Sequence, residues 1–136
     1  MAKKYLFFIL LFIFLFIVVY IIFYNILLVD VSRLKYDFRV SEHIGFNADT
    51  DYLHFGTVFS GSFAQRSFTV NNPKCNLCKV KIDVIGENRN WVSVFDNSFN
   101  IYGNETKAVL ATLNVPADAS VGNYTGYIVI YFWKVI

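Results

Sequence analysis

The sequence predicts an all-β, immunoglobulin-like antiparallel sandwich of about seven strands, preceded by one N-terminal transmembrane helix. Two observations support this prediction. Residues 5–29 form an unbroken apolar run without a charged side chain, and the remainder alternates apolar with polar residues between turn signals. We therefore expect four parts: a short N-terminus at 1–4, the helix at 5–29, a juxtamembrane connector at 30–39 and one sandwich at 40–136.

The apolar run is long enough to cross a bilayer. At about 1.5 Å per residue it spans roughly 37 Å, against a hydrocarbon core of about 30 Å. Its only strongly polar member is Asn25, and it has no small-xxx-small pattern of the kind that brings membrane helices together. We therefore expect membrane lipid to be the partner of this segment.

The same run differs from a cleaved secretory signal. Such a signal has an apolar stretch of roughly 7–15 residues and a small-residue cleavage site, whereas this run contains no Ala, Gly or Ser and residues 27–32 offer no such site. A prepilin-type signal would want a small residue where Tyr5 stands. Because Lys3 and Lys4 precede the helix, we expect a single-pass protein of the cell membrane with its N-terminus in the cytoplasm, although basic residues after the helix make this bias shallow.

Charge is balanced beyond the helix. The full chain carries 12 Lys and Arg against 10 Asp and Glu, a formal net charge of +2, and the excess corresponds to Lys3 and Lys4. A neutral domain with scattered charges lacks the basic footprint of a nucleic-acid-binding protein. We therefore expect no nucleic acid and no small-molecule substrate as a partner.

Five segments of the outer region have the pattern of strands. The alternation is clearest at 79–84, where apolar residues interleave with charged ones. The other four segments are 67–70, 91–95, 107–115 and 124–133. Turn signals separate them at 71–73, 86–88, 102–104, 116–118 and 122–123. Short strands at regular spacing, with no helical pattern between them, favour an antiparallel sandwich.

The start and the end of this region have familiar motifs. LHFGTV at 53–58, followed by Gly61 and by RSFTVN at 66–71, resembles the opening of immunoglobulin-like domains of the ASH/major-sperm-protein kind. VPAD at 115–118 and GNYTG at 122–126 resemble the closing segment of many prokaryotic surface sandwiches. A sandwich on a single-helix anchor is also similar to archaeal surface-appendage accessory proteins. The resemblance implies the fold and says little about activity, because this fold hosts many roles.

Cys75 and Cys78 form the only motif with possible reactivity. A disulfide across this short loop suits an oxidising exterior, and two reduced thiols suit a cytoplasmic domain. A redox pair would want its first cysteine at a helix N-terminus. A zinc site needs four ligands, and His43 and His54 could complete a set with the two cysteines only if the fold brought them together. We expect a disulfide, and thiol–disulfide redox chemistry is the alternative function.

Two asparagines, Asn104 and Asn123, stand in glycosylation sequons at predicted turns, where turn formation is their other role. The acidic pair in 49–51 resembles a fragment of a calcium loop, but it lacks the following Gly and the bidentate Glu, so we interpret it as a solvated turn. No catalytic set, metal site or cofactor is predicted. His43 and His54 are expected at the surface or on an edge strand.

The last predicted strand is apolar on both faces. Tyr127, Val129, Tyr131 and Trp133 share one face, and residues 128, 130 and 132 share the other. A sandwich strand normally shows one face to water, so the first face is either part of a broad core or a partner surface anchored by Tyr and Trp. The sequence thus predicts a membrane-anchored extracytoplasmic binding or structural module, an accessory subunit of a surface assembly rather than an enzyme.

Overall fold

The computed structural model describes residues 2–42, 52–72 and 75–135. Within these residues one helix, α1 (Ala2–Leu27), precedes eight strands. The strands are β1 (Leu28–Val40), β2 (Leu53–Val58), β3 (Phe63–Asn71), β4 (Leu77–Ile85), β5 (Val92–Val94), β6 (Ser98–Tyr102), β7 (Thr106–Asn114) and β8 (Gly122–Lys134), with a short 3₁₀ turn η1 (Arg89–Trp91) before β5. The predicted fold class, an apolar helix followed by an all-β sandwich, is confirmed.

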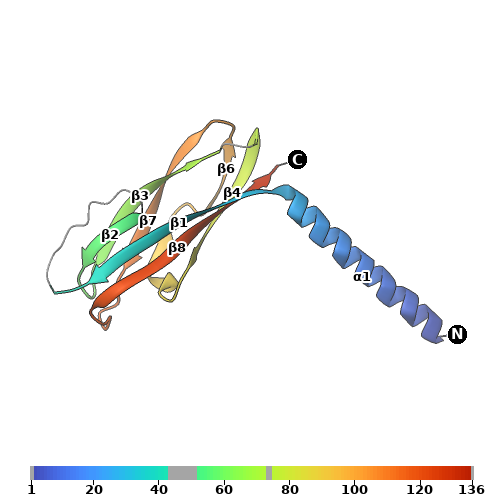
Figure 1. The fold of residues 1–136 in the computed structure, drawn as a ribbon, viewed down its shortest axis with the longest axis horizontal. Helices are drawn as coiled ribbons and strands as arrows, with labels where there is room; N and C mark the ends of the chain where they lie inside the picture. The colour runs from blue at the N-terminus through green and yellow to red at the C-terminus, as the bar shows by residue number, and fades with distance from the viewer. Residues whose placement is uncertain (1, 43–51, 73–74, 136) are drawn as a thin grey trace.

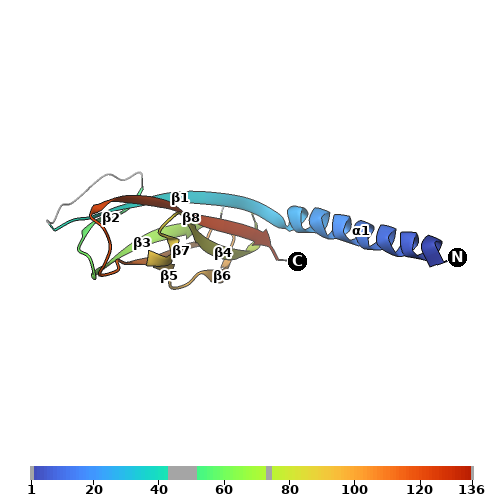
Figure 2. The ribbon, with the colours of Figure 1, turned by 90° about the horizontal axis from the view of Figure 1, so that it is seen from below.

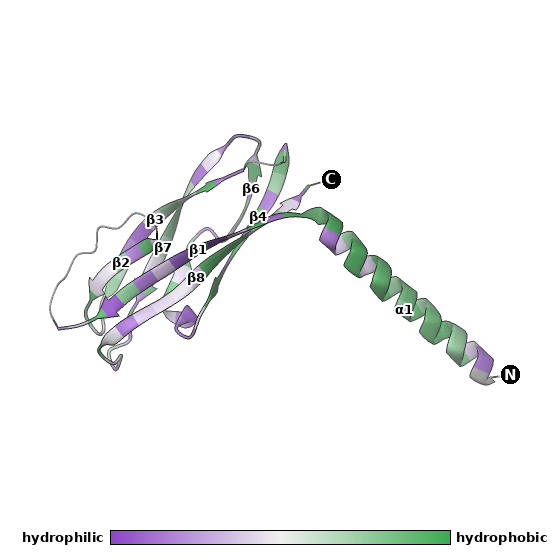
Figure 3. Ribbon diagram, in the orientation of Figure 1, coloured by the Kyte–Doolittle hydropathy of each residue, from purple (hydrophilic) through white to green (hydrophobic). Residues whose placement is uncertain are grey.

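The helix α1 projects away from the sandwich, and its membrane-length apolar segment is not buried by the rest of the described chain (Figures 1 and 2). Its segment Lys4–Leu27 is long and apolar enough to cross a membrane, and it is the only such helix in the described part of the chain. Figure 3 shows α1 as mainly apolar, with hydrophilic colour at its N-terminal end and in one band near its C-terminal end. The side-chain amide of Asn25 donates to the backbone carbonyl of Ile21 at 2.8 Å, so its polar group is satisfied inside the helix.

The predicted connector at 30–39 is wrong, because these residues form the middle of β1. This strand begins at Leu28, one residue after α1 ends, and pairs antiparallel with β8 from Leu28 to Val40. Tyr36, Phe38 and Val40 alternate inward and are buried. The pairing satisfies the backbone of the segment, and this alternation makes burial favourable.

Two sheets make up the sandwich. One has the strand order β2–β1–β8–β4–β6, and the other has β3–β7–β5. All pairs are antiparallel except β1 with β2, which is parallel. The core lies between the sheets and includes Tyr36, Phe38, Val80, Ile82, Ile128, Ile130 and Phe132 from the first sheet, with Phe68, Val70, Val109, Ala111 and Leu113 from the second.

The five predicted strands correspond to β3, β4, β5, β7 and β8, although the predictions 91–95 and 107–115 extend beyond the ends of β5 and β7. Strands β1, β2 and β6 lie outside the five predicted segments. The residues predicted to form a turn at 122–123 instead begin β8, because Gly122 and Asn123 pair with Val40 and Arg39 of β1. Pairing with β1 therefore extends β8 toward its N-terminus, through residues whose types are typical of a turn.

The five-stranded sheet has one end next to α1, which we call helix-proximal, and an opposite end, which we call helix-distal. At the helix-proximal end Leu28 pairs with Trp133, and Cys78 pairs with Lys134. The C-terminal end of β8 therefore lies beside the start of β1 (Figure 1). At the helix-distal end Val40 pairs with Gly122. These two ends place the candidate sites described below.

Candidate functional site: the outer face of the five-stranded sheet

The four residues predicted as a partner surface share the face of β8 that is turned away from the core, which we name the outer face. Their neighbours Ile128, Ile130 and Phe132 belong to the core. Only one of the four is well exposed: Tyr127 is 44% exposed, whereas Val129 is 3% exposed although it lies outside the core cluster. Tyr131 and Trp133 are half-buried. The apolar part of the outer face is therefore smaller than the sequence suggested.

Charged residues flank this row of β8 on both sides. The cross-strand rows are Lys35–Tyr127–Ile85, Arg33–Val129–Asp83, Val31–Tyr131–Lys81 and Leu28–Trp133–Lys79, each written from β1 through β8 to β4. Directly opposite side chains on a sheet lie about 4.5–5.5 Å apart at Cβ, and long charged side chains cover apolar neighbours with their stems. Val129 is buried because Arg33 and Asp83 flank it on the neighbouring strands, and Tyr127 and Tyr131 flank it along β8.

The outer face carries more bases than acids. Arg33, Lys35, Arg39, Lys79 and Lys81 stand on its alternating positions, with Asp37 and Asp83. Lys81 Nζ lies 3.3 Å from Asp83 Oδ2, and both side chains are about half exposed, so this ion pair contributes little to stability. Lys35 Nζ lies 4.8 Å from the ring centre of Tyr52 on the far side of β1. The face is therefore an aromatic row within a mainly basic border.

Trp133 connects the sandwich to the helix. Its ring centre lies 6.3 Å from that of Tyr24 in α1 and 5.5 Å from that of Tyr131, with which it is stacked. Its indole Nε1 is buried and has no hydrogen-bond partner in the described residues. An aromatic cluster thus forms where the helix meets the sheet, which the sequence did not predict because Tyr24 and Trp133 are far apart along the chain.

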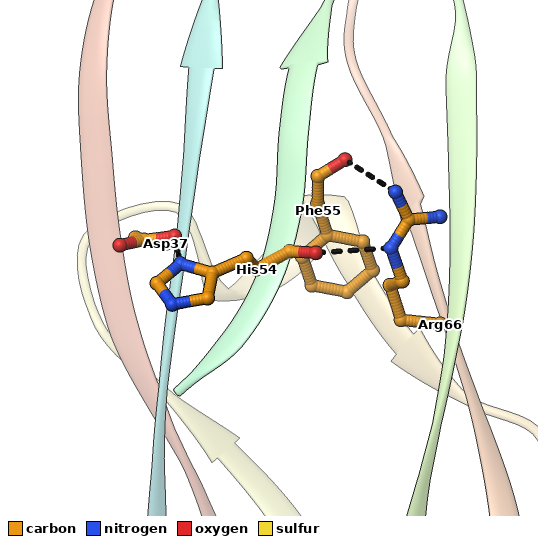
Figure 4. Close-up of polar contacts among 4 residues, drawn as sticks. All are labelled: Asp37, His54, Phe55 and Arg66. Carbon is orange, nitrogen blue, oxygen red and sulfur yellow. Dashed lines mark hydrogen bonds and ion pairs between the residues drawn. The ribbon is translucent and has the colours of Figure 1, made fainter. Parts of the chain in front are cut away.

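A buried histidine lies at the other end of the same face (Figure 4). His54 Nδ1 is 2.6 Å from Asp37 Oδ1, because the parallel pairing of β1 with β2 sets these residues side by side. His54 is on an edge strand, as expected, but it is buried rather than at the surface. Its Nε2 atom has no hydrogen-bond partner within the described part of the chain. Alternation within LHFGTV did not indicate this burial, because it sets His54 on the face opposite to the core residues Leu53 and Phe55.

Arg66 on β3, in the three-stranded sheet, forms hydrogen bonds to β2 of the five-stranded sheet (Figure 4). Its Nε donates to the carbonyl of His54 at 3.0 Å, and its Nη2 donates to the carbonyl of Phe55 at 3.4 Å. Gly56, with φ of +81°, lies where the β1–β2 register shifts, so the adjoining backbone leaves regular strand geometry. Arg66 thereby occupies carbonyls at the edge of β2 that another strand would otherwise pair with. The contacts of Asp37, His54 and Arg66 therefore join the two sheets at this end of the sandwich.

The two cysteines lie at the helix-proximal end, joined as a disulfide with a Cα–Cα distance of 5.9 Å. Cys78 is fully buried on β4 and Cys75 is half-buried in the preceding loop. The buried amide of Asn72 holds this loop: its Nδ2 donates to the carbonyls of Cys75 (2.8 Å) and Ile101 (3.1 Å), and its Oδ1 accepts from the backbone N–H of Cys75 (3.2 Å).

The possible zinc set is not brought together. Cys78 is opposite Lys134, whereas the row of Asp37 and His54 reaches β8 at Thr125. Nine strand positions separate Thr125 from Lys134, which is about 30 Å at 3.3 Å per residue. His43 and the acidic pair in 49–51 lie outside the described residues. Within the described residues no group of three or more His, Cys, Asp and Glu side chains is placed to hold a metal ion.

The two sequon asparagines are exposed and lie at opposite ends of the sandwich. Asn104 is in the turn between β6 and β7 at the helix-proximal end, with φ of 61° in the left-handed region that Asn tolerates. Asn123, predicted at a turn, is the second residue of β8 at the helix-distal end. Both residues were predicted at turns, but only Asn104 occupies one.

A shallow open groove lies where β4 and β5 diverge. Its volume is about 410 Å³, and its polar lining consists of Asp83, Arg89, Asn90, Ser93 and Asn97. Ser93 Oγ already donates to the carbonyl of Thr112 at 3.4 Å. The groove adjoins the outer face at Asp83, and nothing in the sequence had indicated it.

The structure therefore defines a class: an all-β sandwich that follows directly on an N-terminal helix apolar enough to span a membrane. Comparison with known proteins places the chain in no narrower group, because no family model, no curated protein and no solved structure matches it.

Proposed function

We propose that this protein is a membrane-anchored binding or structural module, which displays its sandwich outside the cytoplasm as an accessory subunit of a surface assembly. The observation that carries the proposal is the outer face, an aromatic row with a basic border on a sheet that continues directly from an unburied apolar helix. A helix that is apolar all round needs lipid around it. Tyr, Trp and Arg are the residues enriched at protein–protein contacts.

Three features support the proposed orientation. Lys3 and Lys4 precede the helix, which favours a cytoplasmic N-terminus. The paired cysteines suit an oxidising compartment. The sequons at Asn104 and Asn123 are exposed, as acceptors for glycosylation must be. All three agree with a single-pass protein of the cell membrane whose sandwich lies outside.

The contact region of the outer face centres on Tyr127 rather than on the whole row from Tyr127 to Trp133. Tyr127 is exposed and stands beside Lys35, and Arg33 is exposed one row away. Val129 is covered by its neighbours, and Trp133 packs beside Tyr24 of the helix. The excess of bases over acids on this face fits a protein partner that presents carboxylates around an apolar patch.

The resemblance to domains of the ASH/major-sperm-protein kind remains part of the proposal. It is supported by Gly56 and Gly61 of the motif, which have φ of +81° and +76°, values that side chains other than glycine adopt at a cost. The alternative thiol–disulfide function has less support. Cys78 is fully buried and Cys75 precedes a strand rather than starting a helix, so neither has the setting of a reactive cysteine in redox proteins.

The test is recovery of a partner by crosslinking and pull-down of the full chain from native membranes. We expect Tyr127→Ala combined with Lys35→Glu to reduce recovery at least tenfold, since anchors of a contact typically contribute about 2 kcal/mol or more. Phe63→Ala is the matched control, because Phe63 is an exposed aromatic residue on the other sheet. Equal recovery with the double variant and with the control contradicts the proposed contact face.

A further inference from the structure

We propose that the helix-proximal end of the sandwich lies within the phospholipid headgroup layer, where Trp133 and Tyr24 form part of an interfacial aromatic belt and Lys79 and Lys134 contact lipid phosphates. This inference rests on the proposed function, since it requires α1 to cross the membrane. It adds a second lipid contact, made by the sandwich itself. It also divides the outer face into a lipid-contacting end and a protein-contacting end.

The first argument is continuity of the chain. Helix α1 ends at Leu27, and β1 begins at Leu28, already paired with Trp133. No linker separates the membrane span from the sheet, so the first rows of the sheet begin at the membrane surface. The span Lys4–Leu27 has 24 residues, about 36 Å at 1.5 Å per residue, which exceeds the hydrocarbon core of about 30 Å. Tyr24, in the last turn, therefore reaches the outer boundary of the hydrocarbon.

The second argument is distance along the sheet. Each headgroup layer is about 5–8 Å thick, the difference between the full bilayer and its hydrocarbon core. At 3.3 Å per residue, the row of Tyr131 lies at most about 7 Å beyond that of Trp133, and the row of Tyr127 at most about 20 Å beyond it. The row of Trp133 and Lys79 thus falls inside the headgroup layer. The row of Tyr127 and Lys35 stands in water, where a protein partner can reach it.

The third argument is chemistry. Trp and Tyr are enriched at membrane–water interfaces, where the ring is apolar and its N–H or O–H meets polar groups. Trp133 is half-buried and lies beside Tyr24 of the helix, at the end of the sheet where β1 follows α1. Lys79 is exposed directly opposite Trp133, and Lys134 is exposed next to it. Lysine side chains at this level place their ammonium groups among lipid phosphates.

The chain has two tryptophans, and the structure places them at opposite ends of the sandwich. Trp91 contacts Phe38 and Tyr124 at the helix-distal end. The row of Tyr124 is nine positions along β8 from Trp133, about 30 Å at 3.3 Å per residue. In the Trp91→Phe variant, Trp133 is the remaining tryptophan and reports on the inferred lipid contact. In the Trp133→Phe variant, Trp91 remains and serves as the control far from the membrane.

The experiment is fluorescence quenching by lipid-attached bromine, with the full chain reconstituted in phosphatidylcholine vesicles brominated near the headgroup. In the Trp91→Phe variant we expect the emission of Trp133 to fall by about half, because tryptophan favours this depth. In the Trp133→Phe variant we expect the emission of Trp91 to stay unchanged. Equal quenching of the two tryptophans, or no quenching of Trp133 in vesicle-inserted protein, overturns the inference.

The proposed contacts of Lys79 and Lys134 with lipid phosphates are tested separately. In the Trp91→Phe background, Lys79→Glu with Lys134→Glu should reduce the quenching of Trp133, because carboxylates are repelled by lipid phosphates. Lys35→Glu with Arg39→Glu makes the same change of charge near the helix-distal end and should leave the quenching as it was. Identical quenching in both double variants overturns the assignment of the phosphate contacts.

A carbonate wash separates failure of this inference from failure of the proposed function. If the chain stays in the membrane pellet while Trp133 is not quenched, the membrane anchor stands and the headgroup contact is wrong. If carbonate releases the chain into the supernatant, the anchor itself is wrong, and with it the proposed function.

Discussion

The side chain of Tyr36 on β1 lies over Gly126 on β8, its partner in the sheet register. Tyr36 is completely buried, and a Cβ atom built on Gly126 would overlap the hydroxyl group and two ring carbons of the tyrosine. Gly126 lies inside the segment 124–133, which the sequence predicts as a strand. The structure shows that the reason is close approach: an aromatic ring occupies the space that any side chain at 126 would need.

Gly126→Ala should therefore destabilise the sandwich. Ala normally stabilises a strand relative to Gly by roughly 0.5–1 kcal/mol, but overpacking in a core costs about 1–3 kcal/mol and wins here. We expect a lower free energy of unfolding by urea, measured on the full chain in detergent micelles. Gly122→Ala is the control on the same strand, since its Cβ would meet the ring of Tyr124 at 3.8 Å, an ordinary contact. Similar stability of the two variants contradicts this explanation.

The phenol of Tyr36 makes stability depend on alkaline pH. Burial raises the pKa of Tyr36 above its usual value of 10.0. In the unfolded chain this phenol ionises as pH passes about 10, whereas in the folded protein it stays neutral. The unfolded state then binds fewer protons than the folded state, so stability is fully present below pH 10 and falls as pH rises beyond it.

Tyr36→Phe should remove this part of the alkaline loss. The Tyr36 hydroxyl is buried without a hydrogen-bond partner in the described residues, so its removal should leave stability at neutral pH unchanged or raise it by about 1 kcal/mol. Unfolding free energies measured from pH 8 to 11 for the two proteins would check both statements. A variant as sensitive to alkali as the parent would show that another group is responsible.

Asp37 and Asp83 lie on the same outer face but should differ in their effect on stability. Within the described residues, Asp37 is the hydrogen-bond partner of the buried imidazole of His54. Asp37→Ala leaves the Nδ1 atom of His54 buried without this partner and should cost about 1–3 kcal/mol. Asp83 pairs with Lys81 at a half-exposed site, where such pairs contribute about 0–1 kcal/mol. Thermal unfolding of Asp37→Ala beside Asp83→Ala measures the difference. A larger loss for Asp83→Ala would reverse this ranking.

Asn72 should matter more than the disulfide it adjoins. The loop closed by Cys75 and Cys78 is short, so we expect replacing both cysteines by Ala to cost roughly 1–2 kcal/mol at most. Asn72→Ala removes three side-chain hydrogen bonds that serve Cys75 and Ile101 in a buried setting, and should cost about 2–4 kcal/mol. Urea unfolding of the two variants, each against the parent, decides the order. The opposite order would show that the covalent link dominates this loop.

Local patterns were sufficient for the elements that depend on nearest neighbours. The apolar run before Leu27 predicted the helix, because its length and lack of charge suit a membrane. The alternation at 79–84 predicted β4, because successive residues of a strand face opposite sides. Residues 30–39 were misinterpreted because three basic residues and two acids interrupt the apolar positions, and their strand conformation depends on pairing with β8, a segment about 90 positions later in the chain.

The sequence by itself determined that an apolar helix precedes the sandwich, the all-β class of the remainder, and the two-faced apolar character of the last strand. It placed the helix at 5–29, whereas α1 is Ala2–Leu27, because Leu28 and Val29 are part of β1, which pairs with β8. Only the tertiary structure decided which of those apolar residues stay accessible: Val129 is covered by cross-strand neighbours, whereas Tyr127 is exposed. It also set His54 against Asp37 and Trp133 beside Tyr24. These contacts join segments that are distant in sequence, and strand pairing across the whole chain decides them, so no local pattern contains them.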